Sequence, residues 1–172
     1  MKRLVVFSAD AMVSEDLEYL KQLPNYKKYL AHASIVEKVR SVYPTITYPC
    51  HTTMLTGVWP NKHGILGNYQ MIPGVKPIPW KWFYDWVKIK DDLFVRAKEA
   101  GYTTASVFWP VTGNHPAIDY LVDEYWAQND QDDLLDVYRR SGSVPEVLEI
   151  VKKYVNDDAC RRRIHPALEK FT

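Results

Sequence analysis

The chain has 172 residues, 47% of them hydrophobic, which is enough to bury a core and argues against a disordered tail. Its 22 Lys and Arg residues almost balance its 21 Asp and Glu residues, so net charge gives no reason to expect nucleic acid or an anionic membrane as a partner. Two cysteines are too few for a disulfide framework, and the first apolar run is broken at Ser8, too early for a signal peptide. We therefore expect a cytoplasmic chain with no membrane or nucleic-acid partner.

The first predicted elements surround an acidic residue. Residues 4–8 form a continuous, Val-rich apolar run, which predicts a strand buried on both faces, and Asp10 follows the carboxyl end of this strand. Ser14 is expected to cap a helix that is interrupted at Pro24. Residues 35–42 alternate apolar and charged side chains, which predicts a more exposed strand.

The rest of the chain alternates helix and strand patterns. A helix is predicted from Thr47 to Gly57, because Pro49 stands in its first turn and glycine at its end. Further predicted elements are a helix over residues 91–100 closed by Gly101, strands over residues 103–108 and 120–122, and helices over residues 132–140 and 145–154. Alternating strands and helices predict an α/β fold with a mostly parallel sheet.

Asp10 and Thr47 are the first candidate site residues. Ligands of parallel sheets bind beyond the carboxyl ends of the strands, where Asp10 is expected, although a lone Asp there can equally cap the next turn. Thr47 would begin a helix, with its hydroxyl beside unpaired backbone N–H groups and the positive end of the helix dipole. A threonine hydroxyl is a weak nucleophile until a base or a metal activates it, and Asp10 is a candidate ligand for that metal.

A dense motif surrounds this helix start. The motif residues are Thr47, Tyr48, Pro49, His51, Thr56-Gly57, Pro60, His63-Gly64 and Asn68. Their types and spacing resemble those of the type I phosphodiesterase and nucleotide pyrophosphatase family of the alkaline-phosphatase superfamily. The run VVFSADAM around Asp10 resembles the family's first metal-binding acid, and the run AGYTTASVFWP over residues 100–110 resembles a family strand that ends in Phe-Trp-Pro.

The resemblance implies a function and roles for four residues. It implies an alkaline-phosphatase-like fold, a mostly parallel sheet flanked by helices, that hydrolyses small phosphodiesters or nucleotide pyrophosphates with two zinc ions. Thr47 would be the nucleophile and a metal ligand, Asp10 a second metal ligand, and Asn68 a donor to a phosphoryl oxygen. Tyr48 would stack on a base or leaving group, with burial in the core as the alternative.

Two other readings of the motif are less favoured. In sulfatases, the related turn begins with a cysteine that matures to formylglycine. Counting back from Thr56-Gly57 places Thr47, not a cysteine, at that position, so a sulfatase is disfavoured. His51 and His63 are expected to support the helix and the turn rather than bind metal, as the resemblance implies.

The further metal ligands of the family follow patterns that this sequence does not contain. These patterns are an Asp-x-x-x-His element, an adjacent Asp-His pair and a late His. We therefore expect residues 1–155 to be the amino-terminal part of a phosphodiesterase catalytic domain, with residues 156–172 a charged tail at a truncated or disrupted end. Such a fragment is expected to hold zinc weakly, to hydrolyse little and to self-associate, and a non-catalytic phosphate- or nucleotide-binding role is the alternative.

Overall fold

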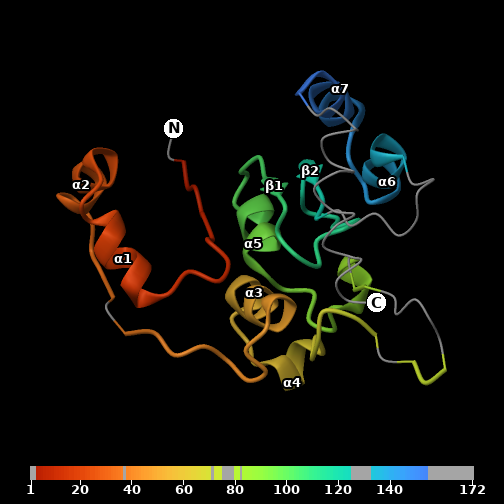
Figure 1. Cartoon of the computed structure of the whole chain (residues 1–172). Coiled ribbons are helices and arrows are strands. Elements are labelled where there is room, and N and C mark those ends of the chain that lie inside the picture. Colours follow the sequence, from red (N-terminus) through yellow and green to blue (C-terminus); the bar gives the residue numbers. More distant parts are fainter. Residues whose placement is uncertain are drawn as a thin grey trace. The chain divides into compact units, whose positions relative to one another are not determined.

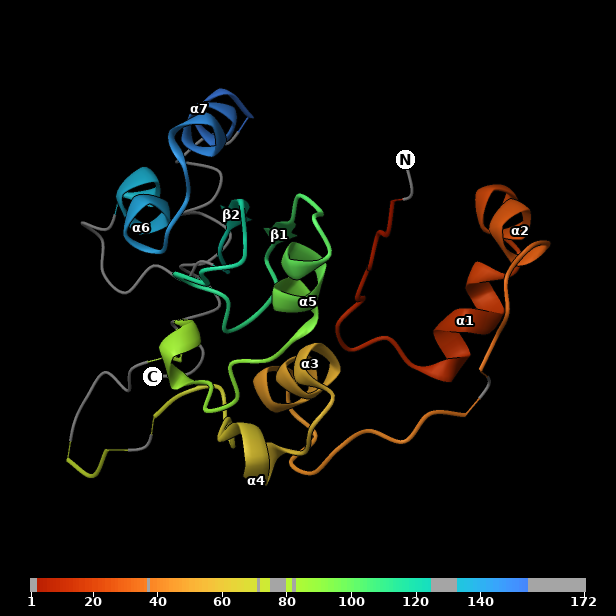
Figure 2. The same ribbon diagram turned by 180° about the vertical axis from the view of Figure 1, so that it is seen from behind.

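The computed structural model describes residues 3–36, 38–70, 72–74, 80–81, 83–124 and 133–154. The chain divides into two compact units, Met1–Ser41 and Val42–Thr172, and each is considered by itself (Figures 1 and 2). The predicted charged tail lies outside the described residues. Within those ranges, no helix combines the length and the apolar character needed to cross a membrane.

The first unit contains two short helices, α1 (Ser14–Leu20) and α2 (Pro24–Leu30), so the interruption predicted at Pro24 is confirmed. The helix cap is Val13 rather than Ser14, and the Val13 N–H donates to the Asp16 carboxylate at 2.9 Å. Neither helix buries a residue.

The strands predicted in the first unit are not found among its described residues. Residues 4–8 form no strand, and Leu4, Val5 and Phe7 are 83%, 87% and 88% exposed. Residues 35–42, of which residue 37 is not described, form no strand either. The prediction of a buried strand at residues 4–8 is therefore wrong for this structure. An apolar run becomes a buried strand only when neighbouring strands pair with its backbone, and none of the unit's described residues forms a strand.

The second unit begins with α3 (Thr47–Thr56) and α4 (Pro60–His63). The helix predicted from Thr47 is confirmed, and it ends at Gly57, whose φ of 70° is in the left-handed region. The Gly57 N–H donates to the Thr53 carbonyl, which closes the last turn. The short helix α4 was not predicted.

The remaining elements of the second unit are the 3-10 helix η1 (Tyr84–Trp86), α5 (Leu93–Glu99), β1 (Ala105–Val107), β2 (Tyr120–Val122), α6 (Leu134–Arg140) and α7 (Pro145–Tyr154). The predicted elements among them appear in the predicted order, with β2 and α7 at the predicted bounds and α5, β1 and α6 shorter than predicted. The 3-10 helix, which precedes them, was not predicted. Strands β1 and β2 pair in parallel, with Ser106 opposite Leu121. The α/β class is confirmed in this limited form, because the sheet of the described residues has two strands.

The pairing leaves one edge of β1 open. The Tyr120 N–H donates to the Thr104 carbonyl, and the Phe108 N–H donates to the Val122 carbonyl. Alternate residues of a parallel strand bond to the same neighbour, so the backbone groups of Ala105 and Val107 point to the edge away from β2. No third strand pairs at that edge in the parts of the chain that the structure describes.

Two groups of buried side chains hold the second unit together. The first, which we call the helix-start cluster, consists of Tyr48, Ile65, Tyr84, Val87 and Val111, with Trp80 packed against it. The second consists of Leu134, Tyr138, Val147 and Val151 from α6 and α7, with Val122 of β2 packed against it. The helix-start cluster contains the neighbour of Thr47 and therefore positions the candidate site.

Candidate functional site

Thr47 is the first residue of α3 and is partly buried. The ring of His51, one turn further along, lies 2.8 Å from the Thr47 carbonyl through its Nδ1 atom. A carbonyl can only accept, so Nδ1 carries the hydrogen and donates it. The ring of Trp109 meets the His51 ring edge-on, with centroids 5.1 Å apart. Contacts within the second unit therefore fix the backbone of Thr47.

Asn68 lies directly beside this helix start. The Tyr48 N–H donates to Asn68 Oδ1 at 2.9 Å, and the Lys81 N–H donates to the Asn68 carbonyl at 2.9 Å. Because a backbone N–H requires an acceptor, the amide oxygen of Asn68 must face α3, and its NH₂ group is directed to the other side as a pair of donors. The structure therefore brings together Thr47, Tyr48 and Asn68, three of the four predicted site residues.

The side chain of Tyr48 is in the core. It is 1% exposed, belongs to the helix-start cluster, and its ring centroid lies 5.7 Å from that of Trp80. This position favours the core alternative over stacking on a ligand.

His63 has a structural environment. The residue is fully buried, and its Nδ1 accepts from the Ile65 N–H at 3.1 Å. Its Nε2 therefore carries the hydrogen and lies 3.0 Å from the Thr53 hydroxyl of α3. Burial lowers the pKa of His63, so the neutral ring is favoured. These contacts agree with the prediction that His51 and His63 support the helix and the turn.

Asp10, the fourth predicted site residue, belongs to the first unit, where it is exposed. Its Oδ1 accepts from the Ala11 N–H at 3.0 Å, and Ala11 has a φ of 58°. A metal ion shared by Asp10 and Thr47 stays a prediction, since the two units are described separately. In the described ranges, no three His, Cys, Asp or Glu side chains are grouped as a metal site requires.

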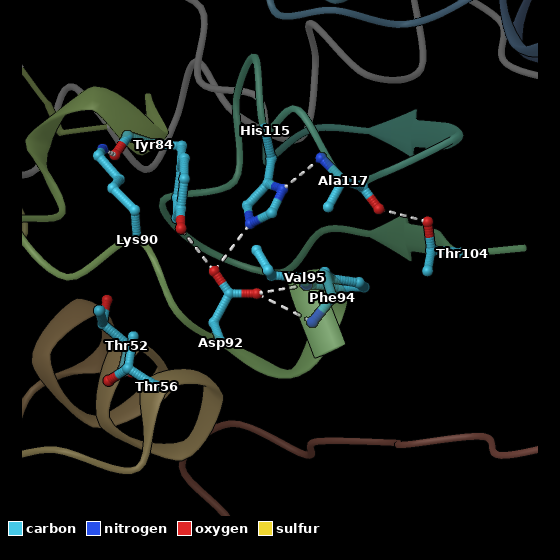
Figure 3. A network of polar contacts seen from close by, with 10 residues as sticks. All are labelled: Thr52, Thr56, Tyr84, Lys90, Asp92, Phe94, Val95, Thr104, His115 and Ala117. Carbon is cyan, nitrogen blue, oxygen red and sulfur yellow. Dashed lines mark hydrogen bonds and ion pairs between the residues drawn. The ribbon is translucent and has the colours of Figure 1, made fainter. Parts of the chain in front are cut away.

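A buried polar network near α3 was not predicted (Figure 3). Asp92 caps α5, and its Oδ1 accepts from the N–H groups of Phe94 and Val95. Its Oδ2 accepts from the Tyr84 hydroxyl at 2.6 Å and from His115 Nε2 at 2.9 Å. The only sequence signal was an Asp before an apolar run, typical of a helix cap.

The network shifts the acidity of its members. Burial alone would raise the pKa of Asp92, but the hydrogen bonds from His115, Tyr84 and Val95 outweigh it, and the pKa is lowered. The pKa of Tyr84 is raised by burial and by the Asp92 carboxylate. The network therefore holds an ionised carboxylate between a protonated phenol and an imidazole.

Known proteins resemble parts of this chain. Ectonucleotide pyrophosphatase/phosphodiesterase family member 1 of Homo sapiens is 30% identical over 112 residues, which cover 62% of this chain and 12% of that protein. Family member 3 of Rattus norvegicus is 28% identical over 131 residues, which cover 67% of this chain and 14% of that protein. The solved structure of murine ectonucleotide pyrophosphatase/phosphodiesterase 5 aligns with a TM-score of 0.47 and 20% identity, over 83% of this chain and 37% of that one.

The chain thus corresponds to 12% and 14% of the length of the first two of these relatives. The model of the family described as type I phosphodiesterase / nucleotide pyrophosphatase matches residues 4–164, which is most of the chain. This chain belongs to the type I phosphodiesterase / nucleotide pyrophosphatase family.

Proposed function

We propose that the chain carries the nucleophile part of a hydrolase that cleaves phosphodiester or nucleotide pyrophosphate bonds through Thr47. The observation that supports this most is the start of α3. A hydroxyl-bearing residue stands at the first position of a ten-residue helix, beside an asparagine whose amide is fixed by the Tyr48 N–H. A helix start favours an anion, and a hydroxyl located there can attack it.

In the proposed reaction, the Thr47 oxygen attacks phosphorus in line with the leaving oxygen. The Thr47 O–P bond forms as the bond to the leaving alcohol or nucleotide breaks, and the leaving oxygen takes up a proton. Water then hydrolyses the phosphothreonine. The NH₂ group of Asn68 donates to a phosphoryl oxygen and stabilises the charge that develops there.

The proposal includes zinc, with the oxygens of Asp10 and Thr47 as the ligands that this chain supplies. Zinc in such a site lowers the pKa of a bound hydroxyl and stabilises a leaving oxygen. Two protein ligands are fewer than the three that catalytic zinc normally uses. Zinc affinity is therefore expected to be weak.

The alternative is a non-catalytic site that binds phosphate or a nucleotide at the start of α3. It is favoured by the lack of a grouped set of metal-ligating side chains in the described residues. The two functions predict different metal dependence. A binding site built from backbone N–H groups and Asn68 should take AMP without metal, whereas the catalytic site should require zinc for turnover.

The test compares the chain with its Thr47→Ala and Thr45→Ala variants. Thr45 is an exposed nearby threonine whose hydroxyl donates to the Val42 carbonyl, so it is a matched control. Hydrolysis of bis-p-nitrophenyl phosphate with added zinc is expected to be slow in the unsubstituted chain, to fall to the uncatalysed rate in Thr47→Ala and to stay unchanged in Thr45→Ala.

Calorimetric titration with AMP, with and without zinc, completes the test. Zinc-dependent turnover that Thr47→Ala abolishes supports the catalytic proposal. AMP binding without zinc, together with no turnover in any variant, overturns it in favour of the binding alternative. Equal turnover in Thr47→Ala and the unsubstituted chain removes Thr47 from the nucleophile role.

A further inference from the structure

We propose that Asp92 is a positioning residue for the anion site at the start of α3, acting through Tyr84. The inference rests on the proposed function, since it concerns the same site. Asp92 belongs to no motif that suggested the site, and its carboxylate lies in a different element from Thr47 and Asn68.

Both oxygens of Asp92 are fully engaged. Oδ1 accepts hydrogen bonds from two backbone N–H groups of α5, as the side chain of a helix N-cap does. Oδ2 makes no bond to α5 and accepts instead from Tyr84 and His115. Since His115 Nδ1 accepts from the Ala117 N–H at 3.0 Å, its Nε2 carries the hydrogen that Asp92 receives. The side chains of Asp92 and His115 are 0% exposed, so no water competes for these bonds.

Tyr84 is consequently held on several sides (Figure 3). Its hydroxyl is fixed by Asp92, its N–H donates to the Gly113 carbonyl at 2.8 Å, and its carbonyl accepts from Lys90 Nζ at 2.8 Å. The His115 ring lies 3.9 Å from the Tyr84 ring between centroids, and Lys90 Nζ lies 4.2 Å from the Tyr84 centroid. A ring restrained in this way has one available position.

Two connections lead from Tyr84 to the proposed site. Tyr84 and Tyr48 belong to the same helix-start cluster, and Tyr48 is the neighbour of Thr47. Three residues before Tyr84, the Lys81 N–H donates to the carbonyl of Asn68, whose Oδ1 in turn accepts from the Tyr48 N–H. If Tyr84 moves, both the start of α3 and the Asn68 amide are affected.

The test uses Tyr84→Phe, which removes one oxygen and keeps the ring, and Asp92→Asn. Leu134→Ala is the control, because it weakens the separate cluster of α6 and α7 without touching the network. Inorganic phosphate is titrated into the full chain, and the backbone N–H of Tyr48 and the side-chain NH₂ of Asn68 are followed by NMR. Both network variants are expected to shift these two signals and to weaken phosphate binding about two- to thirtyfold. Leu134→Ala is expected to do neither.

The outcomes separate the positioning role from the proposed function. If the unsubstituted chain does not bind phosphate, the anion site fails, while the Tyr48 and Asn68 signals still report on positioning. Unchanged signals in Tyr84→Phe overturn the role of Asp92, even if the variant is less stable. Shifted signals with unchanged phosphate affinity also overturn it, because the site then tolerates the displacement. If Asp92→Asn does not fold, Tyr84→Phe decides.

Discussion

The two units of the chain differ in what holds their helices in place. In the first unit, the side-chain hydrogen bonds of α1 join residues three or four positions apart, and neither helix buries a residue. In the second unit, five residues of α3 are buried, and side chains bond across 20 or more positions, as in Tyr48–Asn68 and Asp92–His115. Short helices are marginal without packing. The second unit should therefore carry most of the free energy of unfolding.

Replacing one leucine in each unit gives the strongest test of this contrast. Leu134→Ala should lower the free energy of unfolding by about 2–5 kcal/mol, because Leu134 is buried in the cluster of α6 and α7. Leu23→Ala should cost less than about 1 kcal/mol, since Leu23 is 37% exposed at the start of α2. Urea unfolding followed by circular dichroism measures both. Equal losses would mean that the first unit is stabilised by packing of its own.

A buried acid gives the next largest expected effect. Asp123 follows β2, is 2% exposed, and its Oδ1 has no hydrogen-bond partner among the described residues. Burial raises its pKa to about 7 from an ordinary value of 3.8. A carboxyl with a raised folded-state pKa stabilises fully below its unfolded pKa, and this contribution is lost as pH rises through the folded pKa.

Asp123→Asn should therefore stabilise the chain at pH 8 by about 4 kcal/mol, since the pKa rises from 3.8 to about 7 and each unit of pKa difference corresponds to about 1.4 kcal/mol. At pH 4 the variant and the unsubstituted chain should unfold at similar urea concentrations. The control is Asp85→Asn, because Asp85 is exposed. Asp133→Asn is not suitable as a control, because Asp133 caps α6. An Asp123→Asn effect that does not change with pH would show that Asp123 is not a titrating buried acid.

The smallest expected effect separates backbone strain from packing. Gly57→Ala places a side chain at a φ of 70° where no atom lies within 4 Å of the new Cβ, so the cost is backbone strain alone, about 1–2 kcal/mol. Gly67→Ala, at an ordinary φ and with 3.7 Å to the nearest atom, should be neutral or slightly stabilising. Thermal unfolding compares them. A neutral Gly57→Ala would mean that α3 does not need its left-handed end.

These differences explain which parts could be predicted from sequence. The bounds of α3 and β2 follow from signals inside the segments themselves, namely Pro49 and Gly57 for α3 and a short apolar run for β2. The motif also contains Tyr48 and Asn68, which a hydrogen bond joins in the structure. A buried strand at residues 4–8 depends on neighbours that no local pattern specifies.

His115 was missed for the same reason. Its partner Asp92 is 23 positions away, and neither residue belongs to a sequence pattern that would predict contact with the other. Tyr48 shows a further limit, because an aromatic residue beside a nucleophile fits a stacking surface and a core equally well until its neighbours are known. Residues whose role depends on a distant contact are thus the ones that sequence reasoning cannot place.

The open edge of β1 has a consequence for amide hydrogen exchange. The N–H groups of Ser106 and Phe108 point toward β2, whereas those of Ala105 and Val107 point to the edge at which no described strand pairs. Protection from deuterium should therefore alternate along the strand, residue by residue. A peptide-level measurement that averages over residues 105–108 would report an intermediate rate and conceal two distinct populations, whereas a residue-level measurement would reveal which edge is solvated.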